Sequence, residues 1–262
     1  MKIGERGGFG RFPSWASVFV LALFLLTVPG QSQTFTFTAW DSHSLTASVS
    51  FAQSGSNLIV TLANTTAADT LVPSQVLTAV FFTLAGDPSL TKISAVVAPG
   101  SVTQFGSSGP AGDVGAEWAY LGGLTNAPGG SRYGLSSGGL SDGPMFGPAN
   151  LFEPSHDLNP NTPGAGGLDY GLLSKGDNPA TGNAPVTGKD PLIQYAVVFD
   201  LGLPNGYVLT GNSISDVNFQ YGTSVTDPNL PVVIIPEPSS AALIGFSVLL
   251  LALNHRRRAP SS

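Results

Sequence analysis

The chain has 262 residues, including 33 glycines, 21 prolines and no cysteine, and carries a formal net charge of −6. Without cysteine it has no disulfide scaffold, so its stability must come from an apolar core. Its acidity argues against binding to nucleic acid, because an acidic surface repels phosphate backbones.

Residues 1–32 have the pattern of a secretory signal peptide. Lys2, Arg6 and Arg11 precede an apolar segment at 16–28, and small or polar residues follow at 30–32. A basic start, an apolar core and a small-residue exit are the three parts of such a signal. Because an apolar core of this length is short for crossing a bilayer, we expect cleavage rather than a retained N-terminal anchor.

The charge of the body differs from that of the ends. Residues 31–238 contain four lysines and arginines against 15 acids, a net charge of −11. We therefore expect an acidic domain that meets acidic polysaccharide only through cations or uncharged patches. Residues 33–226 are enough for a single core of ordinary domain size.

The body begins with a strand pattern. Apolar and hydroxyl-bearing residues alternate in 34–38 and again in 46–51, which is the period of a strand with one buried face. Residues 53–56 are typical of a hairpin loop that leads into a third strand at 58–62. Further strands are predicted at 75–84, 91–97, 117–121, 194–201, 207–209 and 217–221.

This pattern predicts an all-β fold, an antiparallel β-sandwich or jelly roll. The strands are short, and Gly, Pro, Asn and Asp separate them, whereas the body has no convincing helical period. The residues predicted to face the core include Phe35, Phe37, Val49, Phe51, Leu58, Val60 and Leu62.

The region 100–190 has a different composition. It holds 21 of the 33 glycines and nine prolines, with scattered aromatic residues. Such a composition favours long loops, and the aromatic residues predict that these loops are ordered and lie over the sandwich. The alternative is two small β units joined by a flexible insert. Residues 227–235 are expected to form an extended spacer behind the body.

Aromatic residues in and near these loops suggest one binding function. A sandwich face or loop that carries exposed aromatic rings can stack on sugars, as in a carbohydrate-binding module. The alternative is that the same rings pack into the core as anchors. The candidates are Trp118, Tyr120, Tyr133 and Tyr170.

Calcium is the only metal that the loop composition leaves open, because calcium takes carboxylate and carbonyl oxygens from flexible loops. The acids do not form a recognisable D-x-D-x-D-G loop, which favours a solvated acidic surface. We therefore predict no cofactor. The candidate ligands, if calcium binds, are Asp142, Asp157, Asp169, Asp177 and Asp190.

The sequence does not favour an enzyme. Two G-x-S-x-G strings, at 134–138 and 139–143, lie in a Gly/Ser-rich stretch without the strand and helix that flank a nucleophile elbow. His43 and His156 lack the paired spacing of a zinc site. A secreted hydrolase would need carboxylates or a triad that only the fold brings together.

The C-terminal segment predicts where the protein goes. Pro236-Glu237-Pro238 precedes an expected transmembrane helix at 239–254, and Arg256, Arg257 and Arg258 follow it as a stop-transfer cluster. The prolines keep the tripeptide extended. The helix would be ~24 Å long against a hydrocarbon core of ~30 Å, which makes a marginal anchor. The arginines are expected to remain in the cytoplasm, so the body is exported.

Together these three parts resemble the PEP-CTERM sorting signal of Gram-negative bacterial surface proteins. The resemblance covers the chain from Ile235 to its end, with the signal at 236–258. It implies that a membrane-embedded exosortase recognises and cuts the chain at Pro236-Glu237-Pro238. The residues themselves also fit an ordinary C-terminal tail anchor.

The resemblance implies a noncatalytic surface or extracellular-matrix protein. Its partners would be the exosortase, the inner membrane before processing, and exopolysaccharide or a biofilm matrix. For the body, a carbohydrate-binding module or a secreted hydrolase remain the alternatives.

Overall fold

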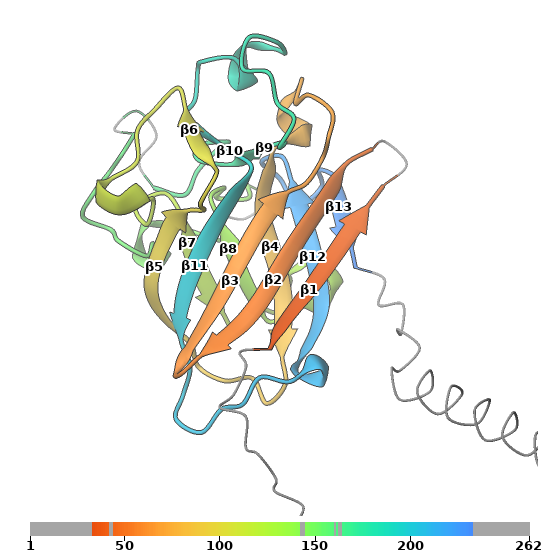
Figure 1. Ribbon diagram of the computed structural model, residues 1–262, viewed down its shortest axis with the longest axis vertical. Helices are drawn as coiled ribbons and strands as arrows, with labels where there is room; N and C mark the ends of the chain where they lie inside the picture. The colour runs from red at the N-terminus through yellow and green to blue at the C-terminus, as the bar shows by residue number, and fades with distance from the viewer. Residues whose placement is uncertain (1–32, 42–43, 142–144, 160, 162–163, 233–262) are drawn as a thin grey trace, which may run out of the picture. The chain divides into compact units, whose positions relative to one another are not determined.

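Two β-sheets packed face to face form the body of the protein (Figure 1). The computed structural model describes residues 33–41, 44–141, 145–159, 161 and 164–232. The predicted signal peptide at 1–32, the sorting signal at 236–258 and its helix at 239–254 lie outside these residues. No helix in the described part of the chain has the length and hydropathy needed to cross a membrane.

The first sheet has five antiparallel strands in the order β1-β2-β3-β11-β5. The alternation predicted from the sequence is confirmed, because Val49, Phe51 and Val60 point inward and are fully buried. Leu58 and Leu62 are buried with them, whereas Phe35 and Phe37, on the edge strand, are only partly buried against the core. The strands are β1 (Thr34–Trp40), β2 (Thr46–Ser54), β3 (Asn57–Asn64), β5 (Thr91–Val97) and β11 (Ala196–Gly202).

The second sheet follows the order β13-β12-β4-β9-β10-β6, with β8 also paired to β4 and β7 to β8. It is mixed rather than purely antiparallel, because β9 and β10 run parallel. Its strands are β4 (Leu77–Leu84), β6 (Val102–Gln104), β7 (Ala119–Gly122), β8 (Tyr133–Ser136), β9 (Leu172–Leu173), β10 (Leu192–Gln194), β12 (Ile214–Tyr221) and β13 (Asn229–Pro231).

The helices of the described residues are short 3-10 turns of three residues each. They lie in the connections between strands, and most of them contain proline at the first or second position, where its fixed φ fits the turn. They are η1 (Pro73–Gln75), η2 (Pro110–Gly112), η3 (Pro128–Gly130), η4 (Pro148–Asn150), η5 (Ala184–Val186) and η6 (Gly211–Ser213).

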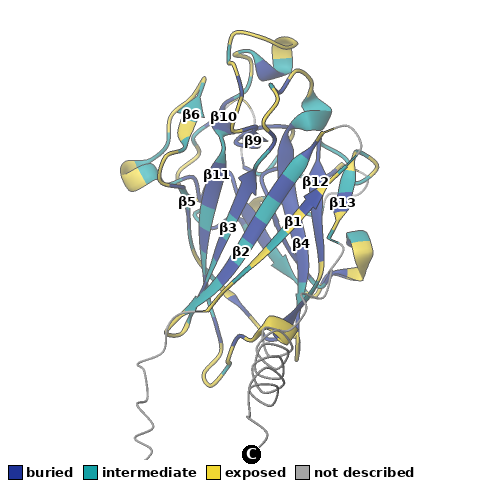
Figure 2. Ribbon diagram, turned by 45° about the vertical axis from the view of Figure 1, so that its right-hand side comes forward, coloured by how far each residue is buried: buried dark blue, intermediate teal, exposed yellow. Residues whose placement is uncertain are grey.

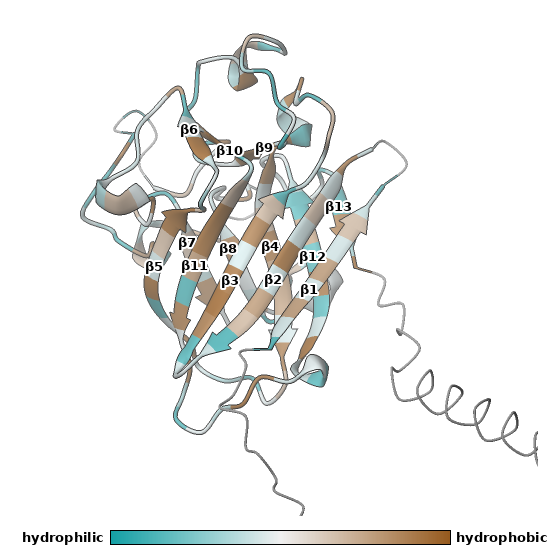
Figure 3. Ribbon diagram, viewed as in Figure 1, coloured by the Kyte–Doolittle hydropathy of each residue, from teal (hydrophilic) through white to brown (hydrophobic). Residues whose placement is uncertain are grey.

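The two sheets differ in how they are covered. On the first sheet the outer face stays open, so its strands alternate between buried and more exposed residues (Figure 2). Strand β4 of the second sheet is buried on both faces, because its inner residues face the first sheet and Phe81 packs under the 100–190 region. Figure 3 shows apolar residues along the strands, interrupted by polar ones on the first sheet.

The 100–190 region forms this cover. It supplies Leu140, Phe146 and Leu151 to a second apolar cluster against Ala79 and Phe81 of β4. These contacts agree with the expectation of loops laid over the sandwich. The region also contributes strands β6 to β9, of which only β7 was expected, at 117–121. The described residues between 33 and 232 fall within one compact unit, which argues against two separate β units.

The strand predicted at 194–201 is divided at Tyr195. The backbone of Tyr195 has φ 93°, which ends β10 and turns the chain into β11. Strand β10 belongs to the second sheet and β11 to the first, so this corner joins the two layers. Tyr195 bonds to both sides of it, from its N–H to Leu173 O at 3.2 Å and from its carbonyl to Asn64 N at 3.0 Å.

Two further expectations need correction. The predicted strand at 207–209 is absent from the described residues, because the Gln53 side chain takes the place of a partner strand and bonds to Tyr207 O at 2.9 Å and Leu209 N at 2.7 Å. Within the expected spacer at 227–235, Asn229–Pro231 forms the edge strand β13 on β12. Pro231 is tolerated on this edge strand, because its nitrogen, which cannot donate a hydrogen bond, needs no neighbouring strand to accept one.

Candidate functional site

The predicted sorting residues are not among those that the structure describes. Pro236, Glu237 and Pro238 lie beyond residue 232, as does the predicted stop-transfer cluster Arg256, Arg257 and Arg258. The geometry of the body is therefore a separate question from that of the signal.

The four candidate sugar-stacking rings lie in the core. Trp118, Tyr120, Tyr133 and Tyr170 are at most 9% exposed, so the prediction of an aromatic platform from these residues is wrong and they are packing anchors instead. Trp118 meets Phe199 of β11 edge-on, with ring centroids 5.0 Å apart. Tyr170 donates its hydroxyl to Ser107 O at 2.7 Å.

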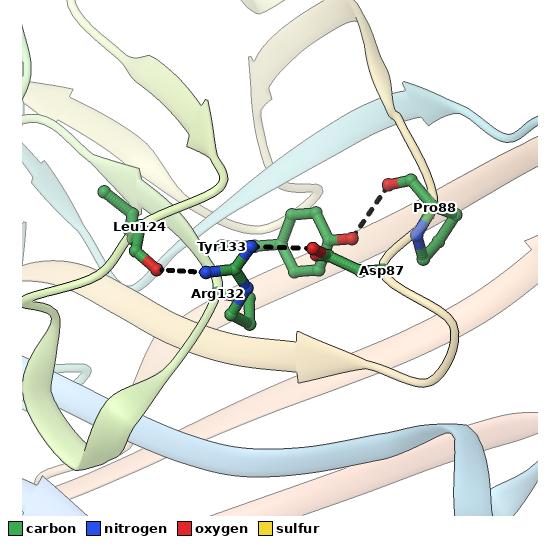
Figure 4. Close-up of polar contacts among 5 residues, drawn as sticks. All are labelled: Asp87, Pro88, Leu124, Arg132 and Tyr133. Carbon is green, nitrogen blue, oxygen red and sulfur yellow. Dashed lines mark hydrogen bonds and ion pairs between the residues drawn. The ribbon is translucent and has the colours of Figure 1, made fainter.

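Tyr133 is held in a stack beside an ion pair (Figure 4). Its ring lies between those of Phe82 and Tyr120, with centroids 5.5 and 6.5 Å away, and its hydroxyl donates to Pro88 O at 2.8 Å. Next to it, Arg132 pairs with Asp87 at 2.7 Å and donates to Leu124 O at 2.9 Å. Burial raises the pKa of Tyr120 to about 12. These polar contacts fix the turn after β4.

The first of the two G-x-S-x-G matches, at 134–138, begins within strand β8. Ser136 lies at the end of β8 and is fully buried, and its hydroxyl donates to Thr78 O at 3.0 Å or Gly138 O at 2.8 Å. A substrate cannot reach this hydroxyl. The second string runs into residues 142–143, which lie outside the described residues.

One pocket of the described residues is lined by acidic side chains. It has a volume of about 210 Å³, and Asp113, Glu153 and His156 line it. Asp113 accepts the Gly115 N–H at 2.9 Å, and the Glu153 N–H donates to Gly115 O at 3.0 Å, so Gly115 holds both acidic residues in place. Bonds from Ser155, and then the charge of His156, lower the pKa of Glu153.

A buried acid lies beside this pocket. Glu117 is 0% exposed, and its Oε1 accepts the N–H groups of Leu158 at 2.8 Å and Asn159 at 3.2 Å. Its Oε2 is buried and has no hydrogen-bond donor among the described residues. Burial, with a smaller contribution from the Asp157 and Asp169 carboxylates, raises the pKa of Glu117 to about 7.

Asn159 links the three acids of this cluster. Its N–H is shared between Glu117 and Asp157, whose Oδ1 lies 3.0 Å away, and its side-chain amide donates to Asp169 Oδ2 at 2.7 Å. The sequence did not single out Glu117. The one feature of the sequence that could have indicated a buried acid here is that Glu117 opens the strand predicted at 117–121.

The five aspartates considered for calcium do not gather in one place. Asp142 lies outside the described residues, Asp157 and Asp169 meet around Asn159, and Asp177 bonds to Thr70 at 3.1 Å. Asp190 lies in the connection before β10. In the described part of the chain, no three acidic or histidine side chains are arranged to hold a metal ion by themselves.

This arrangement favours small cationic or neutral hydroxyl-bearing groups over anions, because carboxylates line the pocket and lie behind it. Comparison of the chain with protein-family models, curated proteins and solved structures finds no match.

Proposed function

We propose that this chain is a noncatalytic exported protein of the bacterial surface or extracellular matrix and the substrate of an exosortase. One observation carries the proposal: Pro236-Glu237-Pro238, an apolar segment at 241–253 and the arginines at 256–258 follow one another in this order. The apolar N-terminal segment at 16–28 supports export.

In the proposed sequence of events, the body crosses the inner membrane and the helix at 239–254 holds it there. The three arginines keep the C-terminus in the cytoplasm. The exosortase then cuts at the extended tripeptide, and the body reaches the cell surface or the surrounding exopolysaccharide. An acidic body with a net charge of −11 over residues 31–238 suits a neutral matrix, or an acidic one bridged by cations.

The position of the last strand adds a spatial constraint. Val232 bonds to Val217 O at 2.8 Å, so the folded body extends to within four residues of Pro236. Four residues span at most about 14 Å even when fully extended. The enzyme we propose must therefore work close to the folded body.

Separate substitutions test recognition and anchoring. Glu237→Gln removes the charge of the motif and keeps its size, so uncut protein should accumulate in the inner membrane. Replacement of Arg256, Arg257 and Arg258 by Asn should weaken the stop and let the marginal helix slip through uncut. Glu153→Gln, an acid-to-amide change in the body, is the matched control and should be processed normally.

Intact-mass spectrometry of membrane and surface fractions measures these outcomes. Wild-type surface protein should end near residue 238. If it still carries residues 256–262, the sorting proposal is wrong and the C-terminus is a tail anchor.

A further inference from the structure

Two loops at one end of the sandwich are tied together by a reciprocal pair of aspartates. One loop follows β3 and the other follows β9, at the top of Figure 1. Asp69 Oδ1 accepts the Asn178 N–H at 2.9 Å, and Asp177 Oδ1 accepts the Thr70 N–H at 3.1 Å. Each acid thus binds the residue that follows the other acid in sequence.

The backbones of these loops also pack closely. A Cβ on Gly176 would lie 2.0 Å from Ala67 O, so glycine is required there. Asn183 donates to Leu71 O at 2.9 Å and closes the far side of the contact. The two acids therefore belong to a built contact between the loops, not to a loose acidic surface.

The remaining oxygen of Asp177 has no donor. The residue is 8% exposed, and its Oδ2 is buried without a hydrogen-bond partner in the described part of the chain. Burial first, and then the Asp69 carboxylate in contact with it, raise the pKa of Asp177 to about 6. Two ionised carboxylates cannot hydrogen-bond to each other, and the buried Oδ2 of Asp177 has no other donor in the described part of the chain.

Neighbouring cationic and amide groups do not donate to the Asp177 Oδ2. Lys175 is the basic residue nearest in sequence, but its Nζ lies 5.0 Å from the centre of the Tyr195 ring. The Gln194 amide donates to the backbone carbonyl of Asp177 at 2.9 Å rather than to its carboxylate. The contact between the two carboxylates therefore calls for a positive ion.

We propose that Asp69 and Asp177 bind one calcium ion between these two loops. Calcium accepts carboxylate oxygens singly or in pairs, tolerates irregular geometry and fills its remaining positions with carbonyls and water, whereas magnesium requires near-octahedral geometry. Two carboxylates without a third acid predict weak binding, with a Kd on the order of 0.1–1 mM, as in other extracellular modules. The ion would fasten one end of the sandwich.

Calcium titration of the full-length chain in detergent, after treatment with EGTA, tests the proposal. At pH 8 we expect saturable heat in calorimetry and a rise in Tm of about 3–8 °C in 10 mM CaCl₂. At pH 5.5 the affinity should fall about fourfold, because a proton competes for the Asp177 carboxylate, whose pKa is about 6.

Amide variants locate the ion. Asp177→Asn should abolish the calcium response and leave the calcium-free Tm at pH 8 unchanged or higher, since it removes a like-charge contact. Asp69→Asn should also abolish the calcium response. It tests the same site if Asp177→Asn does not fold. Asp216→Asn, an exposed acid on β12, removes the same charge and should respond as the wild type does.

Two outcomes would overturn the assignment. If the wild type shows no calcium response at pH 8, the two acids do not bind the ion. If Asp177→Asn and Asp69→Asn both fold and respond like the wild type, the ion binds elsewhere.

Discussion

Burial disfavours the negatively charged form of the Glu117 carboxyl. Two backbone N–H groups bond to its Oε1, while its Oε2 has no donor in the described part of the chain. A buried carboxylate in this condition is costly, and protonation is the simplest relief. The nearby Asp157 and Asp169 charges act in the same direction.

This predicts that stability falls as the pH rises through the titration of Glu117. The pKa of Glu117 is about 7 in the folded chain, whereas the ordinary glutamate value of 4.5 applies to the unfolded chain. Between pH 4.5 and pH 7, the folded state therefore holds a proton that the unfolded state has lost. The loss at pH 8 is on the order of 3 kcal/mol. Glu117→Gln should remove this part of the decline, as measured by urea denaturation in EGTA from pH 4 to 8.

Glu153→Gln is the control, because Glu153 lines the neighbouring pocket but its pKa is lowered. The wild-type decline above pH 4.5 should persist in that variant. Asp177 also titrates in this range, so the difference between the wild type and Glu117→Gln is the informative quantity. Parallel pH profiles for these two proteins would contradict the role of Glu117.

The sequence identified the aromatic residues but not their exposure. Both an exposed sugar platform and a buried anchor are built from tryptophan and tyrosine. The partners that decide between the two are distant in the chain, such as Phe199 for Trp118 and Phe82 for Tyr133. For the same reason the neighbourhood of Asp69 and Asp177 was not predictable, since 108 positions separate them in the sequence.

At the scale of elements, strand β8 depends on a glycine. A Cβ on Gly134 would lie 2.8 Å from Phe146 and 2.9 Å from Phe81, the two rings that join β4 to its loop cover. Gly134→Ala should therefore destabilise the protein by about 1–3 kcal/mol through overpacking. Urea or thermal denaturation measures this difference.

Gly147→Ala is the matched control for that substitution. Its added Cβ meets nothing within 4 Å, and its φ of −157° is open to any residue. We expect a change within about 0.5 kcal/mol. Equal stability of the two variants would mean that the cover over β4 is loosely packed.

Local patterns predicted long strands better than short ones. Strands β1 to β3 repeat their apolar residues with a period of two, and their inward residues were correctly named. Strand β9 has only two residues, so it is too short to have a period. The corner at Tyr195 was not predictable either, because its positive φ is imposed by bonds to Leu173 and Asn64 from other strands.

At the scale of the whole molecule, the Gly/Pro-rich region behaves as part of the core. Trp118 from this region packs into the main cluster, and Phe146 into the second. Limited proteolysis of the native chain should therefore not yield two stable fragments separated by a cut within 100–190. Mass spectrometry identifies the cuts, and the urea-unfolded chain provides the susceptible control. Two such fragments would restore the two-unit alternative.

The strand order also determines when the two sheets can be completed during folding. Strand β11 lies between β3 and β5, and β12 lies between β13 and β4, so late segments occupy interior positions in both sheets. In the export that we propose, β3 has one unpaired edge and the core lacks Phe199 and Phe219 until residues 196–221 have crossed the membrane. Pairings over such long separations form slowly. The protein therefore completes its fold only after nearly all of the body has emerged, and a product truncated before β11 has no closed sandwich to form.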